Sequence, residues 1–187
     1  MKQESTFAYI LRLSLTLFVI AGVIACLLAG VNAITEPRIA QAREERTRKA
    51  LLAVLPNGDN LQKVPFTDGT GLVQELYQSD GGYAVLVAPN GFDGPVSMMV
   101  GVSRDGKVLG LSVISTTDTP GLGAVAGASS SKGQAFREQF IGQSGVLAVT
   151  KDGGSIDALT GATITSRGVT AGVNAALECV RTKEGAQ

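Results

Sequence analysis

The chain has 187 residues, of which 44% are hydrophobic, and its 16 basic side chains balance 16 acidic ones. This size suits one domain of roughly 100–150 residues with an appended segment. The balanced charge gives no basic footprint for nucleic acid, and the lack of histidine excludes imidazole general bases and histidine-ligated zinc or haem. The two cysteines, Cys26 and Cys179, form neither a CxxC motif nor a readable disulfide framework. We therefore expect no nucleic-acid partner and no metal site.

A long apolar run lies near the N-terminus. Residues 13–34 contain no charged side chain, and at 1.5 Å per residue they extend about 33 Å, enough for a hydrocarbon core of roughly 30 Å. They predict a transmembrane helix after a short tail, residues 1–12. A cleaved signal peptide and a lipoprotein signal, whose lipobox "VIAC" would end at Cys26, are the alternatives. The apolar run continues for eight residues beyond Cys26, which favours the uncleaved span.

The orientation of this span is read from the charges on its two sides. Lys2 and Arg12 precede it, whereas "EPRIAQAREERTRKA" after it has five basic and three acidic residues. This count alone does not favour a cytoplasmic N-terminus, but the positive-inside rule is weak when a whole domain is translocated. We predict a single-pass protein of the cell membrane, with a cytoplasmic N-terminus and an extracytoplasmic domain.

After the span, the sequence predicts a connecting helix over residues 35–56, beginning at Pro37 and stopping at "PNG". The remaining residues, 57–187, form the predicted extracytoplasmic domain. There "YAVLVA" and "VSMMVGVSRDGKVLGLSVIS" are typical of strands, and Asp105-Gly106 is a hairpin signal.

The C-terminal part of the chain adds the remaining elements. Residues 128–142 are predicted to be partly helical, and residues 145–154 to form a further strand and turn. The last segment is predicted to be a helix, because its apolar residues recur at spacings of 4, 4 and 3: Val169, Val173, Leu177 and Val180. The fold class is α+β: a small domain with an antiparallel sheet and packed helices, on one transmembrane helix.

The stretch "LTGATITSRGVT", residues 159–170, carries five hydroxyls, one cation and no carboxylate. Thr165 or Ser166 is well placed to cap the helix that follows. Alternatively, the free N–H groups of a helix start beside the small residues Gly161 and Ala162 can bind a phosphate. A third interpretation is that one hydroxyl is itself chemically modified.

A second candidate is "DTPGLG", residues 118–123, where Pro120-Gly121 signals a turn and Gly123 adds a flexible point. A surface turn is the simplest interpretation. Leu122 between two glycines is unusual for a solvated tip, and it could pack against a flat ligand ring.

Other residues carry weaker signals. Lys151 and Arg167, near the hydroxyl cluster, could neutralise a phosphate or be ordinary surface charges. Asp157 alone is typical of a solvated turn. Four aromatic residues are predicted to lie in the core or at its rim and not to serve as stacking platforms for a ligand: Tyr83, Phe92, Phe136 and Phe140.

Together these segments resemble a known family. "DALTGAT" at 157–163, followed by "ITS", resembles the flavinylation motif of FMN-binding-domain proteins, and "TPGLG" at 119–123 resembles their second signature. With the span, "GYAVLVAPNGFDGPVSMMVGV" and "FREQFIG", the chain is similar to the G subunits of Rnf ion-translocating electron-transport complexes. The related C subunit of the sodium-translocating NADH:quinone reductase shares both motifs but is typically longer.

The resemblance implies a covalent cofactor. The hydroxyl of Thr163 would be joined to the phosphate of FMN as a phosphoester, which a separate flavin transferase makes from FAD with Mg²⁺, releasing AMP. Asp157 would be recognised by the transferase. Asp118 stands where the family more often has glutamate, and because its side chain is one methylene shorter, it is expected to lose a hydrogen bond to the flavin ring or to a neighbouring loop. The implied cofactor-binding residues are Thr163 with Thr160, Gly161, Ala162, Thr165 and Ser166, and Asp118, Thr119, Pro120, Gly121, Leu122 and Gly123.

The function implied is electron transfer within a ferredoxin:NAD⁺ oxidoreductase that moves ions. The expected partners are other membrane and redox subunits, membrane lipid and the flavin transferase, and this chain needs no catalytic residue of its own because the cofactor carries the redox chemistry. Two rival functions are a non-redox membrane-anchored scaffold, in which the hydroxyl-rich segment only caps a helix, and a regulatory module that binds FMN non-covalently.

Overall fold

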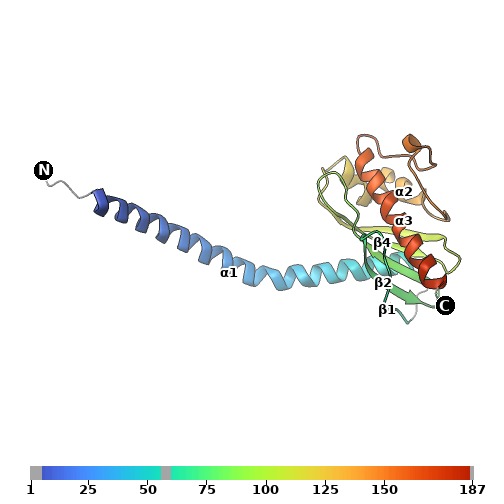
Figure 1. The fold of residues 1–187 in the computed structure, drawn as a ribbon, viewed down its shortest axis with the longest axis horizontal. Helices are drawn as coiled ribbons and strands as arrows, with labels where there is room; N and C mark the ends of the chain where they lie inside the picture. Colours follow the sequence, from blue (N-terminus) through green and yellow to red (C-terminus); the bar gives the residue numbers. More distant parts are fainter. Residues whose placement is uncertain (1–5, 56–59, 186–187) are drawn as a thin grey trace. The chain divides into compact units, whose positions relative to one another are not determined.

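The computed structural model describes residues 6–55 and 60–185 (Figure 1). By its internal contacts the chain divides into two units, residues 1–45 and 46–187. Helix α1, Thr6–Val54, runs through Pro37 without a break. The prediction that a separate helix begins at Pro37 is therefore wrong: the segment after it is rich in the strong helix formers Ala, Gln, Arg and Glu, which continue the helix although proline lacks one hydrogen bond. The predicted domain boundaries stay a prediction.

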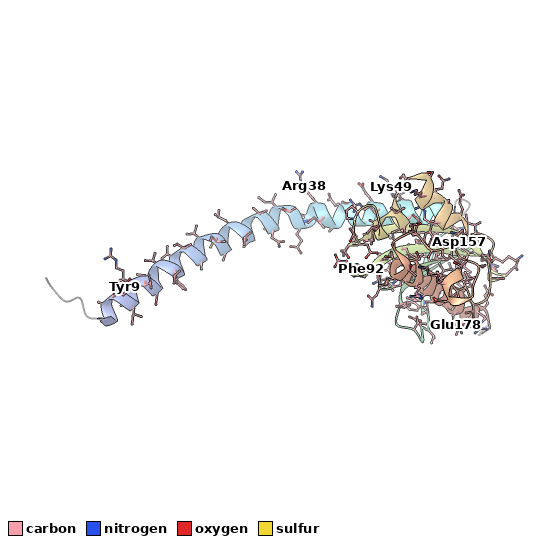
Figure 2. All side chains as sticks on the ribbon, turned by 90° about the horizontal axis from the view of Figure 1, so that it is seen from above. Tyr9, Arg38, Lys49, Phe92, Asp157 and Glu178 are labelled. Atoms are coloured by element: carbon pink, nitrogen blue, oxygen red, sulfur yellow. The ribbon has the colours of Figure 1, made fainter. Side chains whose placement is uncertain are left out.

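The first unit holds the apolar part of α1. In the described part of the chain, this is the one helix that is long and apolar enough to cross a membrane, and none of its most apolar stretch is buried. Large apolar side chains stand exposed along it from Tyr9 to Ile34 (Figure 2). Such a surface is costly in water but suits lipid, which indicates a membrane anchor.

The second unit is built on one antiparallel sheet in the strand order β1-β2-β3-β4-β5. Each strand pairs with the next in the chain, so the expected antiparallel α+β fold is confirmed. The predicted hairpin at Asp105-Gly106 is confirmed too: the N–H of Ser103 donates to the carbonyl of Lys107 at 2.8 Å, and Gly106 has φ +72°. The strands are β1 Gln62–Val64, β2 Val73–Ser79, β3 Gly82–Val87, β4 Val96–Val102 and β5 Val108–Thr116.

One face of the sheet packs against two helices, α2 (Ser131–Glu138) and α3 (Thr163–Gly185), and α3 crosses the strands in Figure 1. The apolar face predicted for α3 is confirmed, because Val169 and Val173 are fully buried there. Phe136 and Phe140 add an edge-to-face pair with ring centroids 5.4 Å apart. This face holds the larger core.

The opposite face packs against the last turns of α1. Leu51 and Val54 of the helix lie against Ala84, Leu86 and Met99 of the sheet. Covered on both faces, β3 is buried at all six of its residues, which explains why "YAVLVA" is continuously apolar.

Two glycines allow α1 to approach this face. Gly101 and Gly110 pair across β4 and β5. A Cβ added at Gly101 would lie 2.5 Å from the carbonyl oxygen of Val54, and one at Gly110 would lie 3.3 Å from the Cα of Val54. Glycine is needed here because the two backbones are close together.

We therefore expect Gly101→Ala to lower the free energy of unfolding by about 1–3 kcal/mol, the usual cost of adding volume to a filled site. Urea unfolding of the detergent-solubilised chain, followed by circular dichroism, measures this change. Gly69→Ala is the matched control, because nothing lies within 4 Å of the added carbon. Equal stability of the two variants would contradict the close packing of α1 on the sheet.

One strand that the sequence predicts after β5 does not form. Residues 145–154 do not form the predicted strand: Val149 and Ile156 make an isolated parallel bridge, beside a short 3₁₀ helix, η2, Thr150–Asp152. The chain turns at both ends of this segment, where Gly145 and Gly153 have φ values of +76° and +84°. Such values interrupt a strand, so only one bridge forms.

Candidate functional site

Two similar turns bring the two sequence motifs together. In the first, the N–H of Leu122 donates to the carbonyl of Thr119 at 3.1 Å, and Gly121 has φ +81°. In the second, the N–H of Ala162 donates to the carbonyl of Leu159 at 2.9 Å, and Gly161 has φ +78°. A glycine at the third position is what a type II turn requires. The turns touch, since a Cβ on Gly161 would lie 3.0 Å from Cδ2 of Leu122.

The helix start differs from the prediction. Helix α3 begins at Thr163, not near Ser166, so Thr165 and Ser166 lie inside its first turn and are fully buried. The Ser166 hydroxyl donates to the carbonyl of Ala162 at 2.9 Å and accepts from the N–H of Leu159 at 3.0 Å. The prediction that Thr165 or Ser166 caps this helix is wrong.

Asp118 lies beneath the first turn and joins three segments. It is 4% exposed, and its two carboxylate oxygens accept from the N–H of Asp93 at 2.8 Å and from the hydroxyl of Thr165 at 2.6 Å. A Cβ on Gly91 or Gly123 would lie 2.7 Å or 2.4 Å from this carboxylate. The expectation that the shorter aspartate loses a hydrogen bond to a neighbouring loop is therefore wrong, because Asp118 accepts one from Asp93.

Above Asp118 lies a cleft with a volume of about 340 Å³, which is within the range of small-molecule pockets. Its lining is Phe92, Asp118, Thr119, Leu122, Gly123, Lys151, Gly161, Ala162, Thr163, Ile164 and Thr165. Both motifs contribute to it.

Three of the lining residues are large, apolar and exposed: Phe92 at 69%, Leu122 at 45% and Ile164 at 51% (Figure 2 labels Phe92). Sequence reasoning placed Phe92 in the core or at its rim and did not consider Ile164. Phe92 carries the same signal as Leu122, a large apolar residue on a glycine-rich loop, "NGFDG". Exposed apolar side chains around a cleft are typical of a binding surface.

Thr163 and Lys151 meet on the polar side of the cleft. Thr163 is partly buried as the first residue of α3, and the ammonium of Lys151 donates to its hydroxyl oxygen at 3.1 Å. Arg167 instead makes two hydrogen bonds with Asp152, at 2.7 and 2.5 Å. These bonds hold the pKa of Asp152 below its ordinary value and raise that of Arg167. Of the two cations considered from the sequence, Lys151 is the one that contacts Thr163.

The first residues of the flavinylation-like motif, from Asp157 to Thr160, line a neighbouring cleft of about 340 Å³ that shares Leu122 as a wall. The backbone of Asp157 is held by the side-chain amide of Gln139, which accepts from its N–H at 2.7 Å and donates to its carbonyl at 3.2 Å. The Asp157 side chain is left exposed. Gln139 was not singled out from the sequence.

Cys179 is not a redox thiol of this site. It is 3% exposed on α3, and burial raises its pKa to about 11. A thiol reacts as its thiolate, which is scarce far below that pKa.

We expect iodoacetamide to leave Cys179 of the folded chain unmodified at about pH 8, where an ordinary thiol of pKa about 8.5 reacts. Because the pKa is raised, reactivity should increase only as the pH approaches 11. Peptide mass spectrometry of native and urea-denatured samples measures the difference. Rapid alkylation of native Cys179 at neutral pH would contradict its burial.

Comparison with known proteins gives two matching family models: an FMN-binding domain over residues 91–178 and an RnfG N-terminal region over residues 1–54. The G subunit of the Na⁺-translocating ferredoxin:NAD⁺ oxidoreductase complex of Acetobacterium woodii is 33% identical over 95% of this chain and 94% of its own length. The proton-translocating counterpart of Clostridium ljungdahlii is 36% identical over 98% and 96%. The G subunit of an ion-translocating oxidoreductase complex of Methanosarcina acetivorans is 30% identical over 94% and 97%.

Proposed function

Because this chain belongs to the family of G subunits of ion-translocating oxidoreductase complexes and contains an FMN-binding domain, we propose that it is the membrane-anchored electron-transfer subunit of an Rnf-type ferredoxin:NAD⁺ oxidoreductase. The FMN is held covalently, as a phosphoester of Thr163. When bound, FMN supplies the electron-accepting and electron-donating chemistry, and the chain holds and orients it.

The polar side of the cleft suits the phosphate end of FMN. The first-turn N–H groups of α3 have no carbonyl partner within the helix, and the positive end of the helix dipole favours an anion. The ammonium of Lys151 adds a full positive charge beside Thr163. Together they offer donors and charge for a phosphodiester.

The apolar side suits a flat ring. Phe92, Leu122 and Ile164 present exposed side chains to the same cleft, and Gly123 keeps the floor open because it has no side chain. These residues would hold the isoalloxazine by burying its faces.

Residues 159–170 carry five hydroxyls, and the contacts of the other four support the choice of Thr163 as the one that is modified. Thr165, Ser166 and Thr170 are buried and donate to protein acceptors. Thr160 lines the neighbouring cleft instead. Thr163 lines this cleft, is partly buried and accepts a hydrogen bond from a cation. This is the observation that carries the proposal.

The proposal also assigns roles to the rest of the chain. The apolar part of α1 anchors the domain beside other membrane and redox subunits, with the N-terminus in the cytoplasm and the FMN-binding domain outside. A covalent tether keeps the flavin in a site that is open to partners. Asp157, whose side chain is exposed, is available for recognition by the flavin transferase that makes the bond.

The test is to co-express the chain with a flavin transferase and to examine it on a denaturing gel under ultraviolet light. We expect a fluorescent band, because a phosphoester survives denaturation. Flavin that is released by denaturant would favour non-covalent binding. A dark band, with the transferase active on another substrate, would favour the non-redox scaffold.

Leu122→Ala tests the ring side of the cleft. We expect the midpoint potential of the bound flavin to shift, because removing the side chain changes how the ring is desolvated. A redox titration followed by flavin absorbance measures this. Leu109→Ala is the matched control, since Leu109 has a similar exposure of 41% on β5 and does not line the cleft. Identical potentials for Leu122→Ala and the wild type would contradict packing on the ring.

A further inference from the structure

We propose that Lys151 is the dedicated counter-ion of the flavin phosphate and that its ammonium assists the attachment reaction at Thr163. This inference rests on the proposed function and deepens it. Neither sequence motif includes Lys151, which comes twelve residues before Thr163 and reaches it through the fold.

The position of Lys151 is fixed on both sides. It lies in η2, and the next residue, Asp152, is held to α3 by the two hydrogen bonds from Arg167. Before it, the N–H of Thr150 donates to the carbonyl of Ile156 at 2.8 Å. A lysine side chain has large rotamer freedom, so anchoring its backbone favours the contact with Thr163.

The surrounding charges leave Lys151 available to an anion. Asp152 makes its ion pair with Arg167, and its interaction with Lys151 is the weaker one. The carboxylate of Asp118 is buried under the cleft and accepts from Asp93 and Thr165. Among the described residues that line the cleft, Lys151 is the one cation. A phosphodiester carries a single negative charge, which one ammonium neutralises.

The reaction defines what this charge does. The hydroxyl oxygen of Thr163 forms a bond to the phosphorus on the FMN side of FAD, and the pyrophosphate bond to the adenylate breaks. AMP leaves, and the hydroxyl proton passes to the medium. The ammonium of Lys151, beside the attacking oxygen, stabilises the negative charge of the phosphoryl group during transfer and stays beside it afterwards.

The first test measures the initial rate of flavin incorporation by denaturing-gel fluorescence. We expect Lys151→Gln to slow it about tenfold, the size of one lost charge-assisted hydrogen bond. Lys151→Arg should retain most of the rate because it keeps the charge. Lys107→Gln, in the hairpin between β4 and β5, removes a lysine outside the cleft and should leave the rate unchanged.

The second test is independent of rate. After long incubation the flavinylated variants are compared by ³¹P NMR, and we expect the phosphodiester signal to move in Lys151→Gln and not in Lys107→Gln. An unchanged rate or an unchanged ³¹P shift in Lys151→Gln would overturn the role of Lys151 while the proposed function stands. A wild-type chain that takes up no flavin would overturn both.

Discussion

Thr163→Val is expected to give a folded chain with no covalently bound flavin. Valine keeps nearly the shape of threonine but has no hydroxyl to form the phosphoester. The fold should persist, because Thr163 is partly exposed and its hydroxyl contacts the side chain of an exposed lysine, Lys151. Denaturing-gel fluorescence after co-expression with the transferase should fall to background, while circular dichroism stays unchanged.

Two controls make this result specific. Thr163→Ser keeps a hydroxyl at the same place and should still accept flavin. Thr160→Val removes a hydroxyl from the same motif, but one that lines the neighbouring cleft, and should leave the gel band fluorescent. Covalent flavin in Thr163→Val would show that another side chain carries it.

Asp118→Ala is expected to lower the free energy of unfolding by about 2–4 kcal/mol, because two donors lose a charged acceptor in a buried place. The carboxylate holds two residues that are distant from Asp118 in the sequence: Asp93, 25 positions before it, and Thr165, 47 positions after it. Its removal should also loosen the cleft, so that flavin is incorporated more slowly. Urea unfolding measures the stability.

The matched control for this loss is Asp157→Ala. The Asp157 side chain is exposed, and its backbone keeps both hydrogen bonds to Gln139, so stability should change by less than about 0.5 kcal/mol. If Asp118→Ala were as stable as Asp157→Ala, the carboxylate would not hold the three segments together.

The sequence predicted those elements whose formation depends on residues close together in the chain. The Asp105-Gly106 turn and the apolar face of α3 were both found from short-range spacing. Leu122 was singled out from its short glycine-rich segment and Thr163 from the resemblance to a family motif, and the fold brings the two residues to one cleft.

The contacts between distant segments could not be predicted in this way. The sequence offered both Lys151 and Arg167 as cations near the hydroxyl cluster, but it could not show that Lys151 is the one that reaches Thr163, because a turn of η2 brings it there. The need for glycine at Gly101 becomes clear only when the end of α1 lies on the sheet. The local sequence predicts that Thr165 caps the helix, but its hydroxyl donates a hydrogen bond to the buried carboxylate of Asp118, which lies on another loop.

Pro37 illustrates the opposite error, in which a local rule was given too much weight. Proline favours the first turn of a helix, so a helix start was predicted there. The flanking residues form one continuous helix instead, because losing one hydrogen bond costs less than ending a long helix.

The most direct test of covalent flavin on Thr163 is peptide mapping of the wild-type chain after co-expression with the transferase. The tryptic peptide of residues 152–167 contains five hydroxyl side chains: Ser155, Thr160, Thr163, Thr165 and Ser166. Fragmentation should place the mass of FMN less one water on Thr163. The same mass on Ser155, Thr160, Thr165 or Ser166, or an unmodified peptide alone, would contradict the account.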